Sequence, residues 1–348
     1  MTHEYEKVLT PSSGLRLHLN ENTAGCSPKV VEALQRLTRQ DIAFYPGYDD
    51  VVAACATRLG VSPERIVLTN GLDEGILALT VAALRERDAS VPEAVVIVPA
   101  FDMYAATAAG VGARVLEVPL GPDFEFPATR ILGAIGPRTR LLFLTSPNNP
   151  TGLVIPPADI IQIAREAPHV RVLVDEAYAD FAETTLLGSA AIEALPNVFI
   201  GRTFAKAYGL AGIRAGVVLG DPAALAPVRR IVPPFSVNAC AVAALIAGLN
   251  DGDYYRWYLG QVRSSKALLY EALARAGVRY WPSEANFVLA QFGDRARAVV
   301  EGLAARGVHV RDKSRDPACP GCIRITTGVV EHTEMCIRAL EEVLCAEA

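Results

Sequence analysis

Lys206 is the residue whose type and surroundings point most directly to chemistry. The chain has only five lysines against 28 arginines, and this one lies among small and apolar neighbours in Gly201-Arg-Thr-Phe-Ala-Lys206-Ala-Tyr-Gly-Leu-Ala-Gly-Ile-Arg214. Most lysines are exposed among other polar residues. An amine in apolar surroundings can instead attack an aldehyde near neutral pH. The segment therefore predicts a nucleophilic lysine, with an ordinary surface lysine as the alternative.

Three more groups of polar residues stand where strands of an α/β sheet would end or a helix would begin. Thr145-Ser-Pro-Asn-Asn-Pro-Thr-Gly152 and Asp175-Glu-Ala-Tyr178 each follow an apolar run, and Thr69-Asn-Gly-Leu-Asp-Glu74 precedes a long helical pattern. Sites in open α/β sheets lie beyond the carboxyl ends of the strands. We therefore expect these groups to meet Lys206 at one edge of a sheet.

The elements that must position these groups alternate between strand and helix. Six short apolar runs recur between helical stretches from about residue 66 to 220: Ile66-Val-Leu, Ala94-Val-Val-Ile-Val, Leu141-Leu-Phe-Leu, Val172-Leu-Val, Val198-Phe-Ile and Gly216-Val-Val-Leu. Runs that are apolar on both faces belong in a mostly parallel sheet flanked by helices. The predicted fold class is therefore α/β.

The length of 348 residues favours a large domain with a smaller companion. We predict a large domain over residues 41–235 and a smaller α+β domain over residues 236–348. The second has helical patterns at about 236–249 and 254–276, then strands near residues 286, 308 and 323. Residues 1–40 form an arm whose amphipathic helix, with Val30, Val31, Leu34 and Leu37 at helical spacing, is expected to pack with the smaller domain.

Composition argues against two classes of partner. The residues are 51% hydrophobic and 20% charged, and the net charge of -5 leaves no surplus of positive charge for nucleic acid. The longest apolar run, residues 239–249, is well short of the roughly 20 residues that cross a bilayer. The first residues carry acids in place of the apolar stretch of a secretory signal. We therefore expect a cytoplasmic enzyme with no nucleic-acid or membrane partner.

Seven scattered cysteines fit reduced thiols better than a disulfide framework. Cys319-Pro-Gly-Cys322 has the spacing of a metal or redox pair, but no second pair completes a tetrahedral zinc site. The alternative is a turn before the strand at Ile323. We expect no metal site.

Taken together, three segments resemble the fold-type I pyridoxal-phosphate (PLP) aminotransferases, and within them the histidinol-phosphate aminotransferase group. They are Ser146-Pro-Asn-Asn-Pro-Thr-Gly152, Asp175-Glu-Ala-Tyr-Ala-Asp-Phe181 and Thr203-Phe-Ala-Lys-Ala-Tyr-Gly-Leu-Ala-Gly-Ile-Arg214. The resemblance extends over nearly the whole chain. It implies a PLP cofactor, reversible transfer of an amino group from a small-molecule donor to a 2-oxo acid such as 2-oxoglutarate, and a large PLP-binding domain with a smaller C-terminal one.

The resemblance also implies roles for the residues around the cofactor ring. Lys206 would hold the cofactor as a Schiff base and move a proton as general base and acid. Asp175 would pair with the pyridine nitrogen, and Tyr178 with Asn149 would hydrogen-bond to the ring oxygen. Phe101 would stack on the ring. The alternatives are a helix cap for Asp175, a turn amide for Asn149, and packed aromatic rings for Tyr178 and Phe101.

Cofactor phosphate needs dense hydrogen-bond donors, which the start of a helix supplies. The residues implied are Gly71, Leu72, Asp73, Thr203 and Arg214. Tyr45, in Phe44-Tyr-Pro, matches a tyrosine that reaches this phosphate from the neighbouring subunit, so the resemblance implies a homodimer.

On the substrate side, the resemblance implies that Arg324 binds an α-carboxylate and Arg311 a distal phosphate. Either arginine could instead form an ion pair at the rim. Two departures affect this assignment. The arm segment Leu9-Thr-Pro-Ser12 offers a serine where the family usually has a tyrosine, and Ala205 stands where a serine usually donates to the cofactor phosphate.

Related activities would use the same cofactor residues. The alternatives are an aminotransferase for aromatic or other amino acids and a PLP-dependent decarboxylase. A PLP-binding regulator would carry a DNA-binding domain as well, for which this chain leaves no room. We therefore expect an enzyme.

Overall fold

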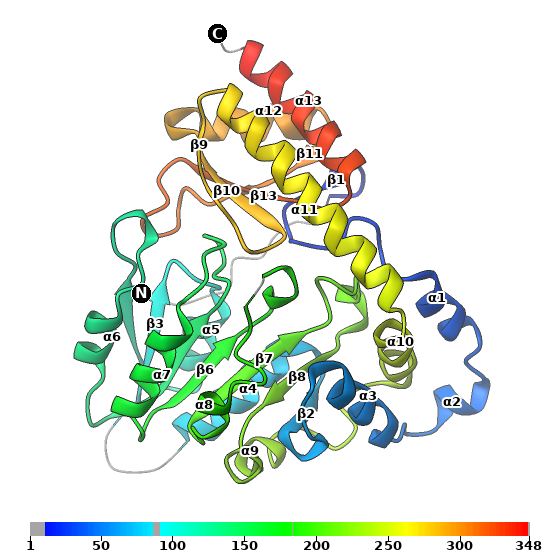
Figure 1. Cartoon of the computed structure of the whole chain (residues 1–348), viewed down its shortest axis with the longest axis vertical. Helices are drawn as coiled ribbons and strands as arrows, with labels where there is room; N and C mark the ends of the chain where they lie inside the picture. The colour runs from blue at the N-terminus through cyan, green and yellow to red at the C-terminus, as the bar shows by residue number, and fades with distance from the viewer. Residues whose placement is uncertain (1–10, 86–90, 183, 347–348) are drawn as a thin grey trace.

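The apolar runs form a seven-stranded sheet in the computed structural model, which describes residues 11–85, 91–182 and 184–346 (Figure 1). Across the sheet the strands are β2 (Ile66–Thr69), β8 (Gly216–Leu219), β7 (Val198–Thr203), β6 (Arg171–Asp175), β5 (Thr139–Thr145), β3 (Glu93–Val98) and β4 (Arg114–Pro119). Neighbouring strands run parallel except for β8, which is antiparallel to both of its neighbours. The predicted mostly parallel sheet is confirmed.

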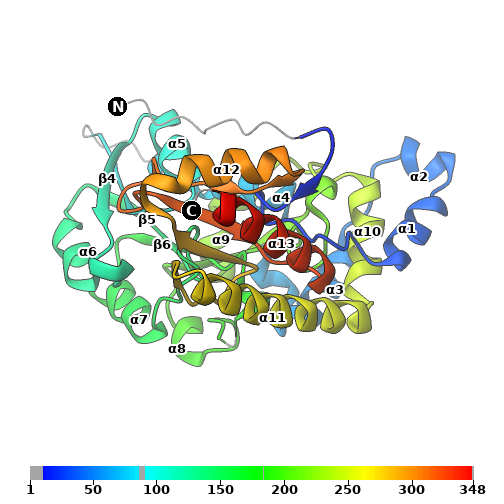
Figure 2. The same cartoon turned by 90° about the horizontal axis from the view of Figure 1, so that it is seen from above.

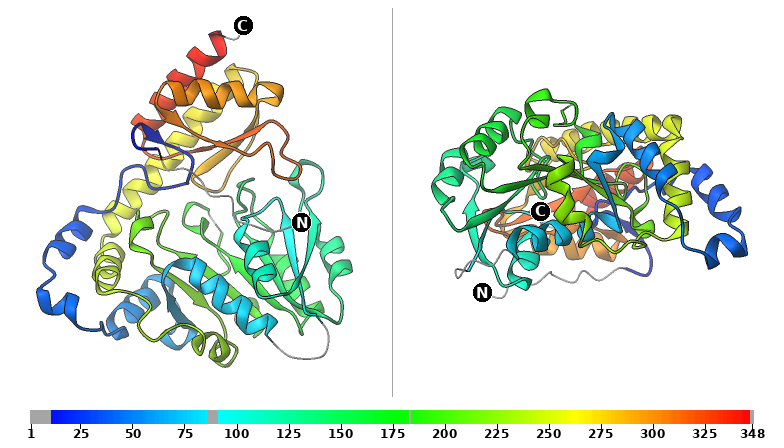
Figure 3. Two further views of the ribbon diagram at one scale, coloured as in Figure 1. Left: turned by 180° about the vertical axis from the view of Figure 1, so that it is seen from behind. Right: turned by 90° about the horizontal axis from the view of Figure 1, so that it is seen from below.

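Alternate residues of these strands enter two separate cores, because successive side chains point to opposite faces. On one face, Leu142, Val172 and Val174 pack with helices α3 (Asp49–Leu59), α6 (Ala128–Ala134), α7 (Pro157–Glu166), α8 (Ala190–Glu193) and α10 (Ala239–Leu249). On the other, Leu141 and Leu173 pack with α4 (Gly71–Leu84), α5 (Met103–Gly110) and α9 (Pro222–Arg229). Figure 3 shows α4, in cyan, lying across this second face.

The smaller domain has its own core, which lies under the C-terminal helices. The antiparallel sheet here has the order β12 (Arg311–Asp312), β13 (Cys322–Thr326), β10 (Phe287–Gln291) and β9 (Arg279–Trp281). It is covered by α11 (Gly252–Arg275), α12 (Ala296–Ala305) and α13 (Val330–Ala346), as Figure 2 shows from above. The N-terminal arm joins this unit, since β1 (Leu15–Arg16) pairs in parallel with β11 (Val308–His309) and Leu17 enters the core.

The packing differs from the predicted division in one respect. Helix α1 (Pro28–Gln35), which is followed by α2 (Arg39–Ala43), packs on α10. Val30 of α1 and Leu245 of α10 share the core of the large sheet and not that of the smaller domain. Helical spacing identified which face of each helix is buried, but it carries no information on which of two cores receives that face.

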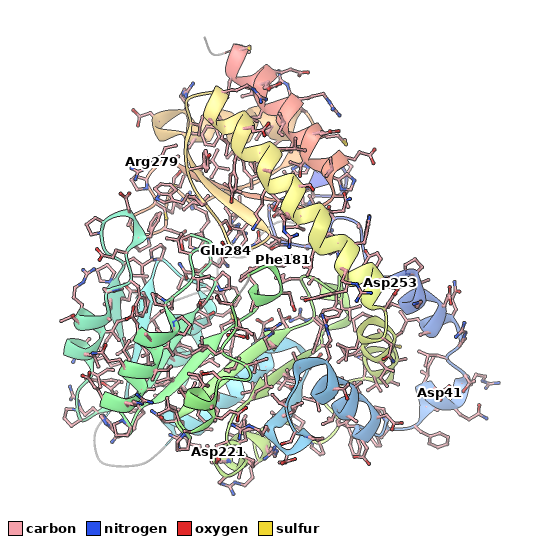
Figure 4. The ribbon with its side chains drawn as sticks, viewed as in Figure 1. Asp41, Phe181, Asp221, Asp253, Arg279 and Glu284 are labelled. Atoms are coloured by element: carbon pink, nitrogen blue, oxygen red, sulfur yellow. The ribbon has the colours of Figure 1, made fainter. Side chains whose placement is uncertain are left out.

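The two units meet where the site is expected. The Glu284 amide donates to the Gly152 carbonyl over 2.8 Å, and Phe181 packs edge-on against Tyr258 of α11. Figure 4 labels Glu284 and Phe181 at this junction. Short 3₁₀ helices complete the secondary structure: η1 (Pro63–Arg65), η2 (Pro122–Phe124), η3 (Ala179–Phe181), η4 (Ala211–Ile213) and η5 (Gly293–Arg295). Among the helices of the described residues, none combines the length and apolar character needed to span a membrane.

Candidate active site

Most of the predicted site residues surround one cavity of about 280 Å³ between the two units. Its walls are formed by the ends of the large-sheet strands, the start of α4, the N-terminal arm and the smaller sheet. The predicted residues that line it are Leu72, Asp73, Phe101, Asn149, Asp175, Tyr178, Thr203, Lys206, Arg214, Arg311 and Arg324. The folding of the chain thus brings together groups that are up to 252 positions apart (72 to 324).

Asp175 is a buried carboxylate at the carboxyl end of β6, with only 4% of its surface exposed. Its Oδ2 accepts a hydrogen bond from the Tyr104 hydroxyl (2.7 Å), and its Oδ1 accepts one from the Ala177 amide (2.8 Å). Burial raises the pKa of Asp175 from 3.8 to about 6, although both hydrogen bonds oppose the rise. Both of these donors are neutral, so a cationic ligand group beside Asp175 would be strongly favoured.

Lys206 lies in the turn that follows β7, and its amine faces the same cavity. Its Nζ donates to the Leu19 carbonyl of the arm (3.1 Å) and lies 5.8 Å from the centre of the Tyr178 ring. The Tyr178 hydroxyl accepts a hydrogen bond from Asn20 Nδ2 (3.0 Å). The amine therefore stands between the arm and the phenol, where a ligand carbonyl in the cavity can reach it.

The start of α4 lies against β8 and Arg214, and it forms a candidate anion site. Gly71 has φ of +74°, and a Cβ atom there would lie 2.7 Å from Arg214 Nη2. At Gly216, a Cβ atom would lie 2.6 Å from the Leu72 amide nitrogen. Only glycine permits this close approach. Arg214 also pairs with Asp73 (2.6 Å), so the helix amides and a fixed guanidinium converge on one point.

Arg324 connects three segments at the substrate end of the cavity. It lies on β13, is 6% exposed, and donates through Nη2 to the His18 carbonyl (2.6 Å) and through Nη1 to Asn149 Oδ1. Arg311 on β12 is its partner across the antiparallel ladder. Two guanidinium groups therefore line one end of the cavity, where planar forks can bind carboxylate or phosphate.

Tyr45 does not line the cavity within one chain. Its side chain is 78% exposed and stacks on Phe235, with ring centres 4.3 Å apart. Ile42 and Phe44 are also largely exposed, so these side chains form an apolar patch around α2. Of the arm segment singled out in the sequence, Leu9 and Thr10 lie outside the described residues, and Ser12 is exposed.

Several residues that the sequence did not single out also line the cavity. Tyr104 holds Asp175 and accepts a hydrogen bond from Thr145 Oγ1 (2.9 Å). Asn20 binds Tyr178, and Lys313, 7% exposed, pairs with Asp316. Lys313 would not have been marked by the argument used for Lys206, because Asp312 and Arg315 near it are charged and make it look like a surface lysine. Tyr104 gave no comparable signal, because a tyrosine in an apolar helix is usually part of a core.

Cys319 and Cys322 form a turn directly before β13, in which the Cys322 amide donates to the Cys319 carbonyl (3.1 Å). Both thiols are free and buried. Within the described residues there is no group of three or more His, Cys, Asp or Glu side chains that could hold a metal ion. The turn interpretation accounts for this segment.

We expect Asp175→Asn to change how the stability of the ligand-free protein depends on pH. The pKa of Asp175 is about 6 in the folded protein and 3.8 ordinarily, so the folded state favours the protonated carboxyl. The contribution of this carboxyl to stability is therefore full below about pH 3.8 and is lost as the pH rises through about 6. An amide does not titrate. The unfolding free energy of the variant, relative to wild type, should rise by about 2 kcal/mol between about pH 4 and pH 7.

Urea unfolding at the two pH values measures this difference. Val174→Ala, a neutral change in the same strand, controls for loss of stability alone and should differ from wild type by a constant amount. A constant difference for Asp175→Asn as well would contradict the raised pKa.

Comparisons with known proteins identify the family of the chain. A sequence model of the family described as aminotransferase class I and II matches residues 12–342. The histidinol-phosphate aminotransferases of Symbiobacterium thermophilum and Oleidesulfovibrio alaskensis are 38% and 36% identical to this chain, covering 95% and 96% of it and 90% and 88% of those proteins. The solved histidinol-phosphate aminotransferase from Sinorhizobium meliloti, in complex with pyridoxal-5'-phosphate, has a TM-score of 0.87 and 28% identity, covering 97% of this chain and 92% of that one. The fold implied by the resemblance is therefore confirmed, and the chain belongs to the aminotransferase class I and II family.

Proposed function

We propose that the chain is a PLP-dependent aminotransferase that takes the amino group of histidinol phosphate and passes it to 2-oxoglutarate. One observation carries this proposal. The buried Asp175 carboxylate, the Lys206 amine and the anion site at the start of α4 all open into one cavity. The names of the relatives at 36% and 38% identity support histidinol phosphate as the donor.

The residues present fit the chemistry of PLP, which has a pyridine nitrogen, an aldehyde and a phosphate. Asp175 offers a buried carboxylate for the protonated nitrogen, Lys206 an amine for the aldehyde, and the start of α4 with Arg214 and Thr203 the donors for the phosphate. Asp175 has no ion-pair partner among the described residues, which favours a cationic ligand group beside it. When bound, the cofactor supplies an electron sink for charge that develops on the substrate.

Each cofactor residue then has a defined task. Asp175 keeps the proton on the ring nitrogen, and Tyr178 with Asn149 hydrogen-bonds to the ring oxygen. Lys206 would take the proton from the substrate α-carbon as general base and deliver it to C4′ of the cofactor as general acid. Phe101 covers one face of the ring. Ala205 carries a methyl group where a serine would donate to the phosphate, so this chain relies on its remaining donors there.

The two arginines divide the substrate contacts in this proposal. Arg324 holds the α-carboxylate of the 2-oxo acid, and Arg311 binds the phosphate of the amino donor. An aromatic amino donor, or decarboxylation of a phosphorylated amino acid, would leave every cofactor contact unchanged. Only the groups at the far end of the cavity distinguish these activities.

Lys206→Ala should remove both the visible absorbance of the bound cofactor and turnover, because no other amine is assigned to the covalent link. Absorbance spectra and half-reactions with an amino donor measure the two effects. Lys266→Ala is the matched control, since Lys266 Nζ also donates to a backbone carbonyl (Ser283, 2.6 Å) but does not line the cavity. An active and normally coloured Lys206→Ala protein would refute the proposal.

A panel of amino donors tests the substrate assignment separately. Half-reactions with histidinol phosphate, phenylalanine, tyrosine, aspartate and basic amino acids can be followed by the change in cofactor absorbance. We expect histidinol phosphate to react with the highest kcat/KM, because only it places a dianion near Arg311. Failure with histidinol phosphate and success with another donor would refute the substrate while leaving the reaction type intact.

We further propose that the active form is a homodimer in which Tyr45 reaches the cofactor phosphate of the neighbouring subunit. The exposed patch of Ile42, Phe44, Tyr45 and Phe235 is the surface that such a contact would cover. We also infer a cytoplasmic location, which accords with all seven cysteines being free.

Mixing two impaired variants tests this shared site. If Tyr45 serves the neighbouring subunit, a hybrid of Lys206→Ala and Tyr45→Ala chains contains one intact site, whereas neither parent does. Activity should therefore rise above the sum of the parents after the subunits are exchanged. If Tyr45 serves its own chain, no hybrid site is intact and mixing restores nothing. Tyr45→Ala alone should weaken cofactor binding by about tenfold, the value of one hydrogen bond to a charged group.

A further inference from the structure

His18 is a buried histidine at the cavity that the proposed mechanism does not use. Its side chain is only 3% exposed, and neither ring nitrogen has a hydrogen-bond partner among the described residues. Buried polar groups nearly always have partners, so an exception at a cavity wall points to a ligand. The backbone of His18 is fixed, because its carbonyl accepts from Arg324 (2.6 Å).

The register of the arm brings the imidazole next to Arg311. Arg16 pairs with His309 in the parallel β1–β11 ladder, and the Leu17 amide donates to the His309 carbonyl (2.8 Å). The ladder ends there, and His18, two residues further along, lies close enough to Arg311 for that charge to lower its pKa. Leu17 enters the core of the smaller domain, so His18 turns to the opposite face. His18, Arg311 and Lys313 all line the cavity.

The charges around His18 favour an anionic ligand. Burial lowers the pKa of His18, the Glu21 carboxylate opposes this, and Arg16, His309 and Arg311 lower it further. A neutral imidazole has one N–H donor and one acceptor nitrogen. A cationic ligand group would face Arg311 and Lys313, and an apolar group would leave both imidazole nitrogens without partners. An oxyanion can accept a hydrogen bond from the imidazole and from both cations.

We propose that His18 is a specificity-determining residue that hydrogen-bonds to the distal anionic group of the amino donor, at the end of the cavity formed by Arg311 and Lys313. This inference rests on the proposed transamination, and it adds a residue of the N-terminal arm to the substrate contacts. The anion is a phosphate ester or a carboxylate, which share the acceptor oxygens that the imidazole requires.

Pairs of donors with and without the anion isolate this contact. The holoenzyme is assayed with histidinol phosphate against histidinol, and with glutamate against glutamine, and kcat/KM is compared within each pair. For the pair whose anion His18 binds, we expect His18→Phe to lower the ratio of kcat/KM for the anionic donor to kcat/KM for the neutral donor by about 10- to 100-fold. The kcat/KM for the neutral donor should change by less than about threefold. His18→Gln, which keeps a donor, should retain an intermediate ratio.

His309→Phe is the matched control. Its ring lies 6.4 Å from that of His18, but His309 does not line the cavity and its Nε2 contacts the Ser13 carbonyl. It should leave the ratio unchanged. Three outcomes would overturn the role of His18 without affecting the proposed reaction. They are an unchanged kcat/KM ratio in His18→Phe, an equal loss of kcat/KM for both donors of a pair, and a wild type that prefers neither anionic donor over its neutral counterpart.

Sulfate, which does not titrate in this range, provides a test that does not depend on turnover. An anion beside His18 favours the protonated imidazole, so sulfate should perturb the cofactor absorbance more strongly as pH falls from about 8 to 6. His18→Phe should lose this dependence and His309→Phe should keep it, while Arg16, Glu21, Arg311 and Lys313 remain in both variants. If no amino donor reacts, the proposed function fails. If sulfate binds independently of His18, the role of His18 is refuted whatever the outcome for the proposed function.

Discussion

The buried carboxylate of Asp175 is the constraint on which the rest of the site depends. It lies at the end of a strand in the middle of the large sheet, where helices on both faces exclude water. Two neutral donors satisfy its oxygens, but they leave its pKa well above the ordinary value. A fold that maintains such a group at a cavity wall loses stability near neutral pH and regains it when a cation binds there.

The next residue along the chain shows that this arrangement is local to the cavity. Glu176 is also buried, but it accepts from Arg202 (3.1 Å), which also pairs with Asp180 (2.7 Å). Successive residues at a strand end point to opposite sides. On the side away from the cavity, the acid has its own arginine and contributes to a closed ion-pair network. On the cavity side, Asp175 has only neutral donors, and this difference supports its proposed role in binding a cationic ligand group.

The sequence allowed the large sheet and the meeting of the proposed cofactor residues at one cavity to be predicted, because both depend on local patterns. Runs that are apolar on both faces became strands, and the polar groups that follow them met at one cavity. Strand β4 was missed because its residues are mostly exposed or half-buried at an edge of the sheet, with Glu117 among them. Helix α10 was assigned to the smaller domain because an almost entirely apolar helix fits either core.

The residues that sequence reasoning missed owe their positions to the tertiary fold. Tyr104 reaches Asp175 only because β3 and β6 are separated by a single strand, β5, in the sheet. His18 reaches Arg311 only because the arm adds a strand beside β11, about 290 positions later in the chain. Neither arrangement leaves a pattern in neighbouring residues.

The two ends of the cavity are built from different parts of the structure. The cofactor end is built from strand ends of one rigid sheet, so its residues stand at spacings that the strands impose. The proposed substrate end is assembled from the arm, β12 and β13. Arg324 of β13 contacts the arm through the His18 carbonyl and the turn after β5 through Asn149. A substitution at Arg311 or Lys313 can alter which donor binds without moving Asp175, which the large sheet holds in place. The sequence therefore indicates the reaction type more directly than the substrate, because the sheet that carries Asp175 leaves a local pattern and the assembly of the arm with β12 and β13 does not.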